Sequence, residues 1–138
     1  MSHAIRLRGP WTCQPLDWAD ASAAPLPAGG TLEMPGDWGR LLGDDFRGRV
    51  RFTRQFNLPT GLDAGQRVWL VIDSVHAEAD VVLNGSSVGQ VCNVPNPPAG
   101  RFDITSLLQS RNELVVEVSC PATSPEPGRL GLVKLEIE

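Results

Sequence analysis

Apolar and polar residues alternate along several short stretches of the chain, with the period of two that is typical of strands with one buried face. The alternation is clearest in residues 113–119 and in the closing residues 132–138. Residues 49–58 alternate as well, with a change of phase between Phe52 and Phe56. These stretches predict strands that each turn one face toward a core.

A nearly continuous apolar run predicts a further strand at residues 67–73. If its even-numbered positions face the core, Trp69 and Val71 face outward on the other side of the sheet. An exposed apolar patch on that face would mark an interface. Trp69 and Val71 are therefore predicted as interface residues.

The dipeptide Asn84-Gly85 is the strongest turn signal in the chain. Both residues tolerate the positive φ that a two-residue type I′ turn requires. The turn predicts a hairpin whose strands are residues 79–83 and 87–91.

Helical character is confined to residues 103–108, which predict one helical turn with Asp103 or Thr105 as its cap. Residues 19–30 and 121–128 are loops by composition. Several short strands with turns between them predict an all-β, antiparallel sandwich or barrel.

Composition agrees with a single domain, residues 1–138, because a chain of 138 residues can bury a stable core without disulfides or metals. The net charge of −4 comes from interspersed signs, so neither nucleic acid nor a membrane surface is expected as a partner. No run approaches the roughly 18 apolar residues of a membrane helix. No signal peptide is visible at the first residues, which favours a cytoplasmic location.

The three cysteines are scattered along the chain without the Cys or His spacing of a zinc site. No metal or other cofactor is expected from them. Cys92 and Cys120 are expected to be small apolar fillers near strand ends.

Several short motifs occur one after another along the chain. They are Leu7-x-Gly9-x-Trp11, Met34-Pro-Gly-Asp37-Trp38, Phe46-Arg-Gly48, Phe52-x-Arg54-x-Phe56, Leu83-Asn84-Gly85, Val88-Gly89, Phe102-Asp103-Ile104-Thr105, Asn112-x-Leu114-x-Val116-x-Val118 and Gly128-x-Leu130-x-x-Val133. Together they resemble the N-terminal sugar-binding domain of glycoside hydrolase family 2, the family of β-galactosidases, β-glucuronidases and β-mannosidases. The resemblance covers essentially the whole chain. It implies an antiparallel β-sandwich of the galactose-binding-domain-like, jelly-roll type.

Two segments depart from the family pattern. Val50-Arg51 stands where the family has an aromatic pair, and residues 90–100 replace the family's His-x-Gly-Gly-Tyr-x-Pro-Phe. The catalytic carboxylates of the family enzymes lie on a separate TIM barrel of about 250 residues, which a chain of this length cannot contain. The resemblance therefore implies a non-catalytic, carbohydrate-binding-type module rather than an enzyme.

The residues that could suggest catalysis have simpler structural interpretations. Asp44-Asp45 lies in a polar turn, without the frame that would hold two carboxylates about 5 Å apart across a glycosidic bond. Asn112-Glu113 resembles an Asn-Glu catalytic dipeptide, but it precedes a strand where the family has a turn, so a structural role is expected. His76 has no serine or cysteine at a recognisable spacing, so a hydrogen-bonded or exposed histidine is expected.

Carbohydrate binding uses flat aromatic faces together with planar polar side chains. Trp11 matches a core position of the family, whereas Trp38 follows Pro35-Gly36-Asp37 in a predicted loop. The alternative for Trp38 is that it packs beneath its own loop. The alternative for Asn93 and Asn96 is that they satisfy the backbone of their own Pro-rich turn. The predicted carbohydrate-binding surface consists of Asp37, Trp38, Arg40, Asn93, Asn96 and Arg101.

Three functions are consistent with these observations. The first is a stand-alone module that binds carbohydrate through its edge loops. The second is an assembly module that forms a homodimer or docks through the sheet face around Trp69. The third is a detached accessory domain that acts with a partner hydrolase. A structural calcium ion is an open alternative in each case, but no run with dense oxygen ligands gives it a position.

Overall fold

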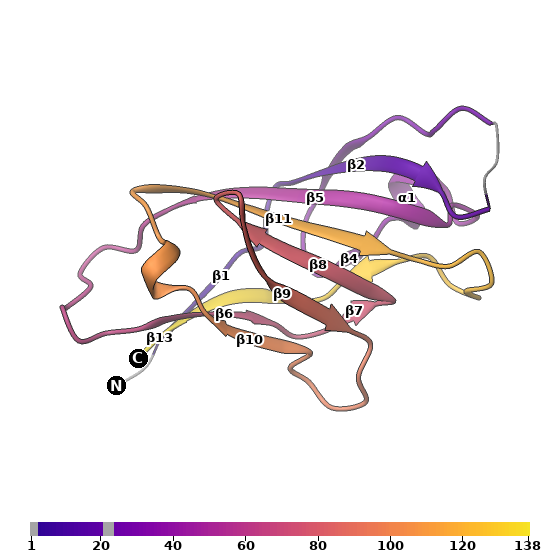
Figure 1. Cartoon of the computed structure of the whole chain (residues 1–138). Coiled ribbons are helices and arrows are strands. Elements are labelled where there is room, and N and C mark those ends of the chain that lie inside the picture. The colour runs from indigo at the N-terminus through magenta and orange to yellow at the C-terminus, as the bar shows by residue number, and fades with distance from the viewer. Residues whose placement is uncertain (1–2, 21–23) are drawn as a thin grey trace.

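The computed structural model describes residues 3–20 and 24–138, which fold as an antiparallel β-sandwich (Figure 1). One layer is a four-stranded sheet in the order β1 (His3–Arg6), β13 (Val133–Ile137), β6 (Val68–Ile72) and β10 (Gly100–Asp103). The other is a six-stranded sheet in the order β3 (Gly30–Leu32), β2 (Trp11–Trp18), β5 (Gly48–Asn57), β11 (Arg111–Ser119), β8 (Glu78–Leu83) and β9 (Ser86–Cys92). The predicted fold class is confirmed.

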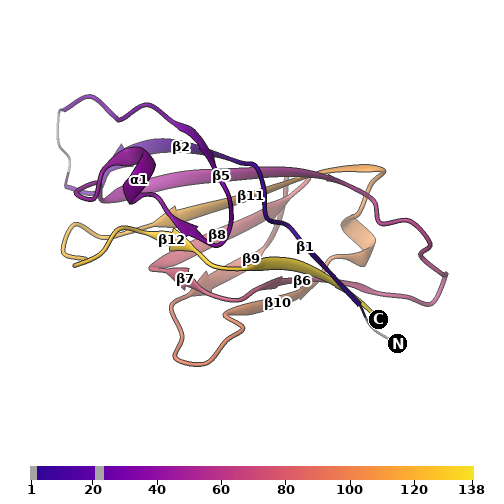
Figure 2. The ribbon, with the colours of Figure 1, turned by 180° about the vertical axis from the view of Figure 1, so that it is seen from behind.

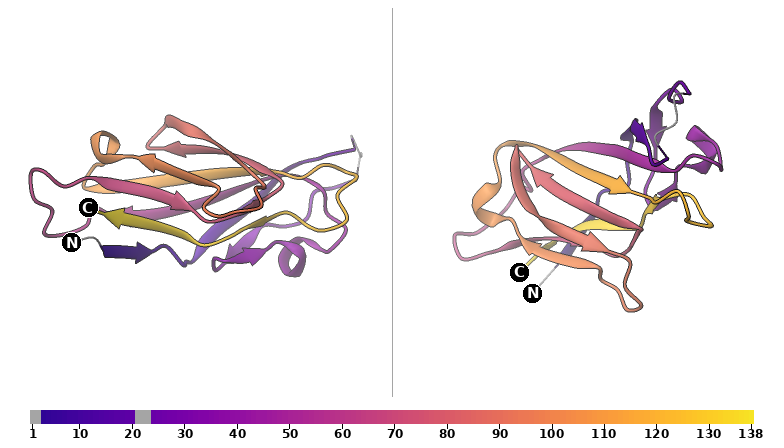
Figure 3. Two further views of the ribbon diagram at one scale, coloured as in Figure 1. Left: turned by 90° about the horizontal axis from the view of Figure 1, so that it is seen from below. Right: turned by 45° about the vertical axis from the view of Figure 1, so that its right-hand side comes forward.

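A small three-stranded sheet consists of β4 (Gly36–Asp37), β12 (Arg129–Leu130) and β7 (Val75–His76). Two short helical segments, α1 (Gly39–Leu42) and η1 (Thr105–Leu107), complete the secondary structure of the described residues. The two termini lie side by side because β1 pairs with β13. The helix α1 and the loop 121–128 lie at the opposite end of the sandwich (Figures 1 and 2), and Figure 3 shows the same separation from below.

Alternate residues of the two large sheets fill the core between the layers. In β6 the residues Val68, Leu70 and Ile72 have no exposed surface, and the even-numbered residues of β11 are buried in the same way. Each such side chain contributes about 1.5–3 kcal/mol when it is removed from water. The predicted alternation in these strands and the predicted core position of Trp11 are confirmed.

The hairpin between β8 and β9 turns at Asn84-Gly85, as predicted. Both residues have a positive φ, 52° at Asn84 and 82° at Gly85, as a type I′ turn requires. The turn is therefore a local consequence of these two residue types.

The predicted helical turn is the 3₁₀ helix η1, but the predicted cap is wrong: the N-cap is Ile104, which makes no side-chain cap bond, and Asp103 supports the turn from the preceding position. Its carboxylate accepts a hydrogen bond from the backbone amide of Thr105 at 3.0 Å and another from the Thr105 hydroxyl at 2.6 Å. These bonds stabilise the ionised form, so the hydroxyl and amide of Thr105 hold the pKa of Asp103 below its ordinary value.

The predicted change of phase in residues 49–58 is wrong. The strand β5 pairs with β11 in one continuous register from Arg49 to Asn57, so Phe52 and Phe56 share one face. The position between them on that face is Arg54, which is only half-buried because it lies at an open part of the sheet edge. A long side chain can occupy such a position and still carry its charged head outward.

The expectation for the cysteines holds for Cys120, which is buried, and fails for Cys92, which is exposed on β9. Cys92 lies opposite Glu78 on the outer face of the sheet, where no second layer covers it. The predicted loop 121–128 contains no strand or helix. Of the predicted loop 19–30, residues 21–23 lie outside the described residues and Gly30 begins β3.

No helix in the described part of the chain is long and apolar enough to span a membrane.

Candidate carbohydrate-binding site

Trp38, the aromatic residue predicted to stack on a sugar, lies in the core with no exposed surface. Its indole N–H donates a hydrogen bond to the backbone carbonyl of Phe46 at 3.1 Å, and its ring stacks on Phe52 with the centroids 6.4 Å apart. Gly128 packs directly against the ring. The prediction of ligand stacking by Trp38 is therefore wrong, because apolar packing draws the large ring beneath its own loop.

Asp37, the residue before it, remains at the surface on β4. Its carboxylate accepts a hydrogen bond from the amide of Gly39 at 2.9 Å, which leaves further acceptor capacity. Directly opposite Asp37 across the three-stranded sheet is Arg129, and opposite Arg129 is His76. Residues that pair across antiparallel strands project to the same face, so these three side chains form one polar row.

A hollow of about 280 Å³ opens beside this row, lined by Asp37, Ser74 and Arg129 together with backbone and apolar neighbours. Arg129 is exposed and forms no ion pair with any described residue. A carboxylate and an unpaired guanidinium thus face one small cavity. Arg129 was missed by the sequence reasoning, because a single arginine at the end of a Pro-rich loop carries no local signal of its position.

Asn93 and Asn96 lie in the exposed loop between β9 and β10. The amide of Asn93 donates to the carbonyl of Ala77 at 2.9 Å, which holds this loop beside β7. β7 and β4 are the two edges of the three-stranded sheet, about 10 Å or two strand spacings apart, and Asn93 lies beyond the β7 edge, so it is further than this from Asp37. The fold brings them to the same end, on opposite sides of Arg129.

Arg40 and Arg101 stand apart from the hollow. Arg40 is exposed on α1 and is not among the residues that line the cavity. Arg101 lies on β10, in ion pairs with Glu136 at 3.3 Å and Glu138 at 2.7 Å on the outer face of the four-stranded sheet. The structure therefore does not bring Arg101 together with the other predicted residues.

The Arg101 guanidinium lies over the ring of Trp69, 3.9 Å from the ring centroid. Trp69 faces outward, as predicted, but it is half-buried, and Val71 beside it is only 3% exposed. The prediction of an exposed apolar patch is therefore wrong, because charged side chains of neighbouring strands cover this part of the sheet. An interface role for Trp69 and Val71 stays a prediction.

His76 is hydrogen-bonded, in agreement with its structural interpretation. Its Nε2 lies 2.8 Å from the hydroxyl of Ser124, which donates in turn to the carbonyl of Glu126. Asp44 and Asp45 are exposed. These contacts hold the loop 121–128 against β7 rather than assemble a catalytic group.

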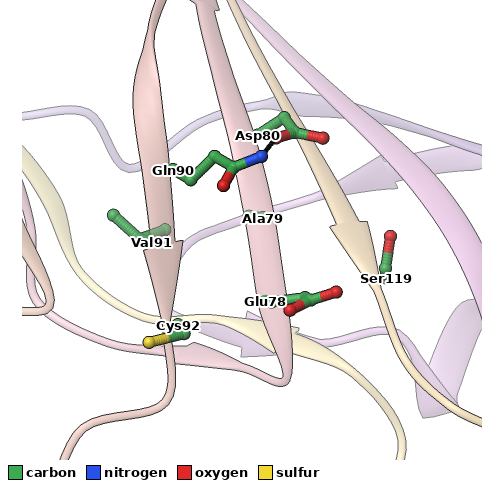
Figure 4. A pocket seen from close by; sticks show the side chains of 7 residues that line it. All are labelled: Glu78, Ala79, Asp80, Gln90, Val91, Cys92 and Ser119. Carbon is green, nitrogen blue, oxygen red and sulfur yellow. Dashed lines mark hydrogen bonds between the residues drawn. The ribbon is translucent and has the colours of Figure 1, made fainter.

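The outer face of the six-stranded sheet carries a second hollow, of about 330 Å³ (Figure 4). Its polar lining comes from β8, β9 and the end of β11, and Gln90 donates to the Asp80 carboxylate at 2.7 Å. The lining contains no aromatic ring and no cation. In the described part of the chain, no group of three or more His, Cys, Asp or Glu residues is arranged to hold a metal ion. The hollow beside Asp37 and Arg129 is the better candidate for a sugar.

Residues 47–128 match the model of the glycosyl hydrolase 2 galactose-binding domain-like family. The chain belongs to this family. The match covers more than half of the chain and includes β5, the hairpin, the Asn93 loop and β11.

Three solved structures illustrate the likeness of this galactose-binding-like domain to parts of larger enzymes. They are the FMN-binding β-glucuronidase from Faecalibacterium prausnitzii L2-6 (25% identity, TM-score 0.74, 99% of this chain and 22% of that one), the β-glucuronidase of Bifidobacterium dentium complexed with coumarin-3-O-glucuronide (24%, 0.75, 99% and 30%) and the β-glucuronidase of Bacteroides uniformis (20%, 0.75, 99% and 18%). The chain thus spans less than a third of each of these proteins. Among curated proteins, no sequence matches this chain.

Proposed function

We propose that this domain is a non-catalytic, carbohydrate-binding-type module whose ligand occupies the hollow beside the three-stranded sheet. The observation that carries the proposal is the pairing of Asp37 and Arg129 across β4 and β12, both exposed and both on the lining of one cavity. Asp37 would accept hydrogen bonds from sugar hydroxyls, and the hydroxyl of Ser74 would both donate and accept them.

Arg129 makes a uronic acid the preferred sugar in this proposal. A guanidinium pairs with a carboxylate through two parallel hydrogen bonds, and Arg129 has no carboxylate partner among the described residues. The similar Bifidobacterium dentium protein is a β-glucuronidase complexed with a glucuronide. The glucuronide bound by that enzyme and the unpaired Arg129 of this domain both favour a uronic acid as the ligand.

The affinity should be low. Trp11 and Trp38 are buried, and Arg101 covers the face of Trp69, so none of these rings offers a stacking surface. A few hydrogen bonds and one ion pair at an exposed site correspond to a Kd of about 1 mM, roughly −4 kcal/mol.

Titration with D-glucuronate and with D-glucose, followed by NMR chemical shifts, tests the proposal. The two sugars differ only in the C6 group, so glucuronate should bind and glucose should bind more weakly. Arg129→Gln should remove the preference for glucuronate, and Asp37→Asn should weaken both sugars. Arg111→Gln, a matched change at the opposite end of the sandwich, should leave both titrations unchanged. The proposal would be overturned if sugar addition changed the chemical shifts of Arg129→Gln and Asp37→Asn as much as those of the wild type.

A second candidate function is that of an accessory domain acting with a partner hydrolase. The similar β-glucuronidases contain this fold as 18–30% of a longer chain, which favours a role beside a catalytic domain. Addition of this domain to a family 2 hydrolase that lacks its own N-terminal domain should then raise its activity. No change in activity and no complex by light scattering would exclude this second function.

A further inference from the structure

At the end of the sandwich that holds the termini, the six-stranded sheet has an open edge. β2 pairs with β5 only from Thr12, opposite Thr53, to Trp18. Before Thr12 the chain crosses to the other layer, where β1 pairs with β13. Residues 54–57 of β5 are therefore paired on one side by β11 and left without a strand partner on the other, within the described part of the chain.

A hollow of about 340 Å³ occupies this open edge, and its charge is one-sided. Arg6, Arg54 and Arg111 line it, and no carboxylate belongs to its lining. None of the three arginines forms an ion pair with a described residue. The whole chain has a net charge of −4, so three unpaired arginines at one cavity run against its overall balance.

Two of the guanidinium groups are already held in place. Arg54 donates through Nη1 to the carbonyl of Gln55, and Arg111 donates through Nε and Nη2 to the side-chain carbonyl of the same residue. The Nε of Arg54 is buried and has no hydrogen-bond partner. A buried charged donor without an acceptor is unfavourable, and an anion in the hollow would supply the acceptor.

We propose that this cavity, the β5 edge pocket, binds a tetrahedral oxyanion carried as a phosphate or sulfate ester on a small organic molecule. A phosphate ester carries three acceptor oxygens and more negative charge than a carboxylate, so it can bridge two guanidinium groups and still accept from a further donor. The remaining lining includes Ile5, which is 39% exposed, and Phe56, which is largely buried. These apolar surfaces provide room for the uncharged part of the ester.

Phosphorus NMR and calorimetry with inorganic phosphate, inorganic sulfate and glucose 6-phosphate test the proposal at low ionic strength, where charge pairing is least screened. Phosphate should bind in the millimolar range, and glucose 6-phosphate should bind more tightly because it also contacts Ile5. Arg54→Gln and Arg111→Gln should each weaken phosphate roughly tenfold, the loss expected when one charge-assisted contact is removed. Sulfate competition against glucose 6-phosphate shows whether either oxyanion suffices.

The matched control is Arg40→Gln, which removes an exposed arginine on α1, at the other end of the molecule and outside the lining of both hollows, and should leave phosphate binding unchanged. Arg111 is exposed, so its variant keeps the test valid if Arg54→Gln fails to fold. The proposal is overturned by the absence of phosphate binding, by binding that survives Arg111→Gln, or by glucuronate that competes as well as phosphate. Phosphate binding is tested at Arg54 and Arg111, and glucuronate binding is tested at Arg129 and Asp37, so failure at one pocket is distinguishable from failure at the other.

Discussion

At the scale of single residues, Asn112 is the one polar side chain among the described residues that is buried with the core. Its carbonyl oxygen accepts from the side chain of Asn84 at 2.9 Å and from the amide of Gln109 at 2.8 Å. Its amide donates to the carbonyls of Gln109 and Phe56. The side chain thus joins the start of β11 to β5 and to the hairpin turn, which is a structural role.

Asn112→Ala should destabilise the domain by roughly 2–4 kcal/mol, because several buried partners lose hydrogen bonds that are worth about 1–3 kcal/mol each. Urea unfolding measures the change. The matched control is Glu113→Gln at the next position, which is exposed and should change stability by less than about 0.5 kcal/mol. Equal effects of the two variants would contradict the role assigned to Asn112.

Cys13 makes stability depend on alkaline pH. Burial raises the pKa of its thiol from 9.0 to about 12. Between these values the unfolded thiol loses its proton and the folded thiol keeps it, so the stabilisation is fully present below pH 9.0 and declines as pH rises toward 12. The expected decline is about 1.4 kcal/mol per pH unit within that window.

Urea unfolding of the wild type and of Cys13→Ala at about pH 7 and about pH 10 tests this dependence. The variant should be less stable at both values, because the thiol fills core space, but its stability should fall less between them. The sequence contains no tyrosine and a single lysine, so few other groups titrate in this range. Parallel declines in the two proteins would show that Cys13 is not responsible.

At the scale of elements, local sequence patterns predicted those features that interactions between neighbouring residues determine. The type I′ turn follows from the backbone preferences of Asn84 and Gly85, and the alternation in β11 follows from one buried face. β5 was predicted with a false change of phase because Arg54 occupies an inward position beside an open edge. Only the course of β2 and β1, which are far from β5 in sequence, creates that edge.

Gly85→Ala should destabilise the hairpin by about 1–2 kcal/mol, because φ at Gly85 is +82° and a side chain is strained there. No atom would contact the added methyl group, so the effect isolates backbone strain. Gly65→Ala is the control, since that site is equally open and has no positive φ in the left-handed region. It should be neutral or slightly stabilising. A thermal-unfolding comparison in which both variants lose equal stability would contradict the prediction.

At the scale of the whole molecule, the sandwich separates two candidate binding sites. The Asp37–Arg129 hollow is lined by residues of β4 and β12, and the β5 edge pocket is lined by residues of β1, by the last residues of β5 and by the first residue of β11. Figures 1 and 2 show that β1 lies at the end of the sandwich that carries the termini. Neither site brings two carboxylates together across a cavity.

The purified domain should release no 4-nitrophenol from 4-nitrophenyl β-D-glucuronide above the buffer rate. Retaining hydrolysis needs two framed carboxylates about 5 Å apart, and Asp44 and Asp45 are adjacent and exposed in a turn. Hydrolysis that is lost in Asp44→Asn or Asp45→Asn would assign catalysis to that pair. Hydrolysis that both variants retain would indicate a contaminating enzyme.

The sequence by itself determined the strands that correspond to β5, β6, β8, β9, β11 and β13, the turn at Asn84-Gly85, the place of η1, the buried faces of β6 and β11, and the family resemblance. These features depend on side-chain period, on backbone preferences and on motif order, all of which can be read within a few neighbouring residues. The tertiary structure alone decided that Trp38 is buried, that Arg101 covers Trp69, and that Arg129 rather than Arg40 faces Asp37. Each of these outcomes depends on which distant strands become neighbours, because exposure and pairing are set by packing between segments that the local pattern does not relate.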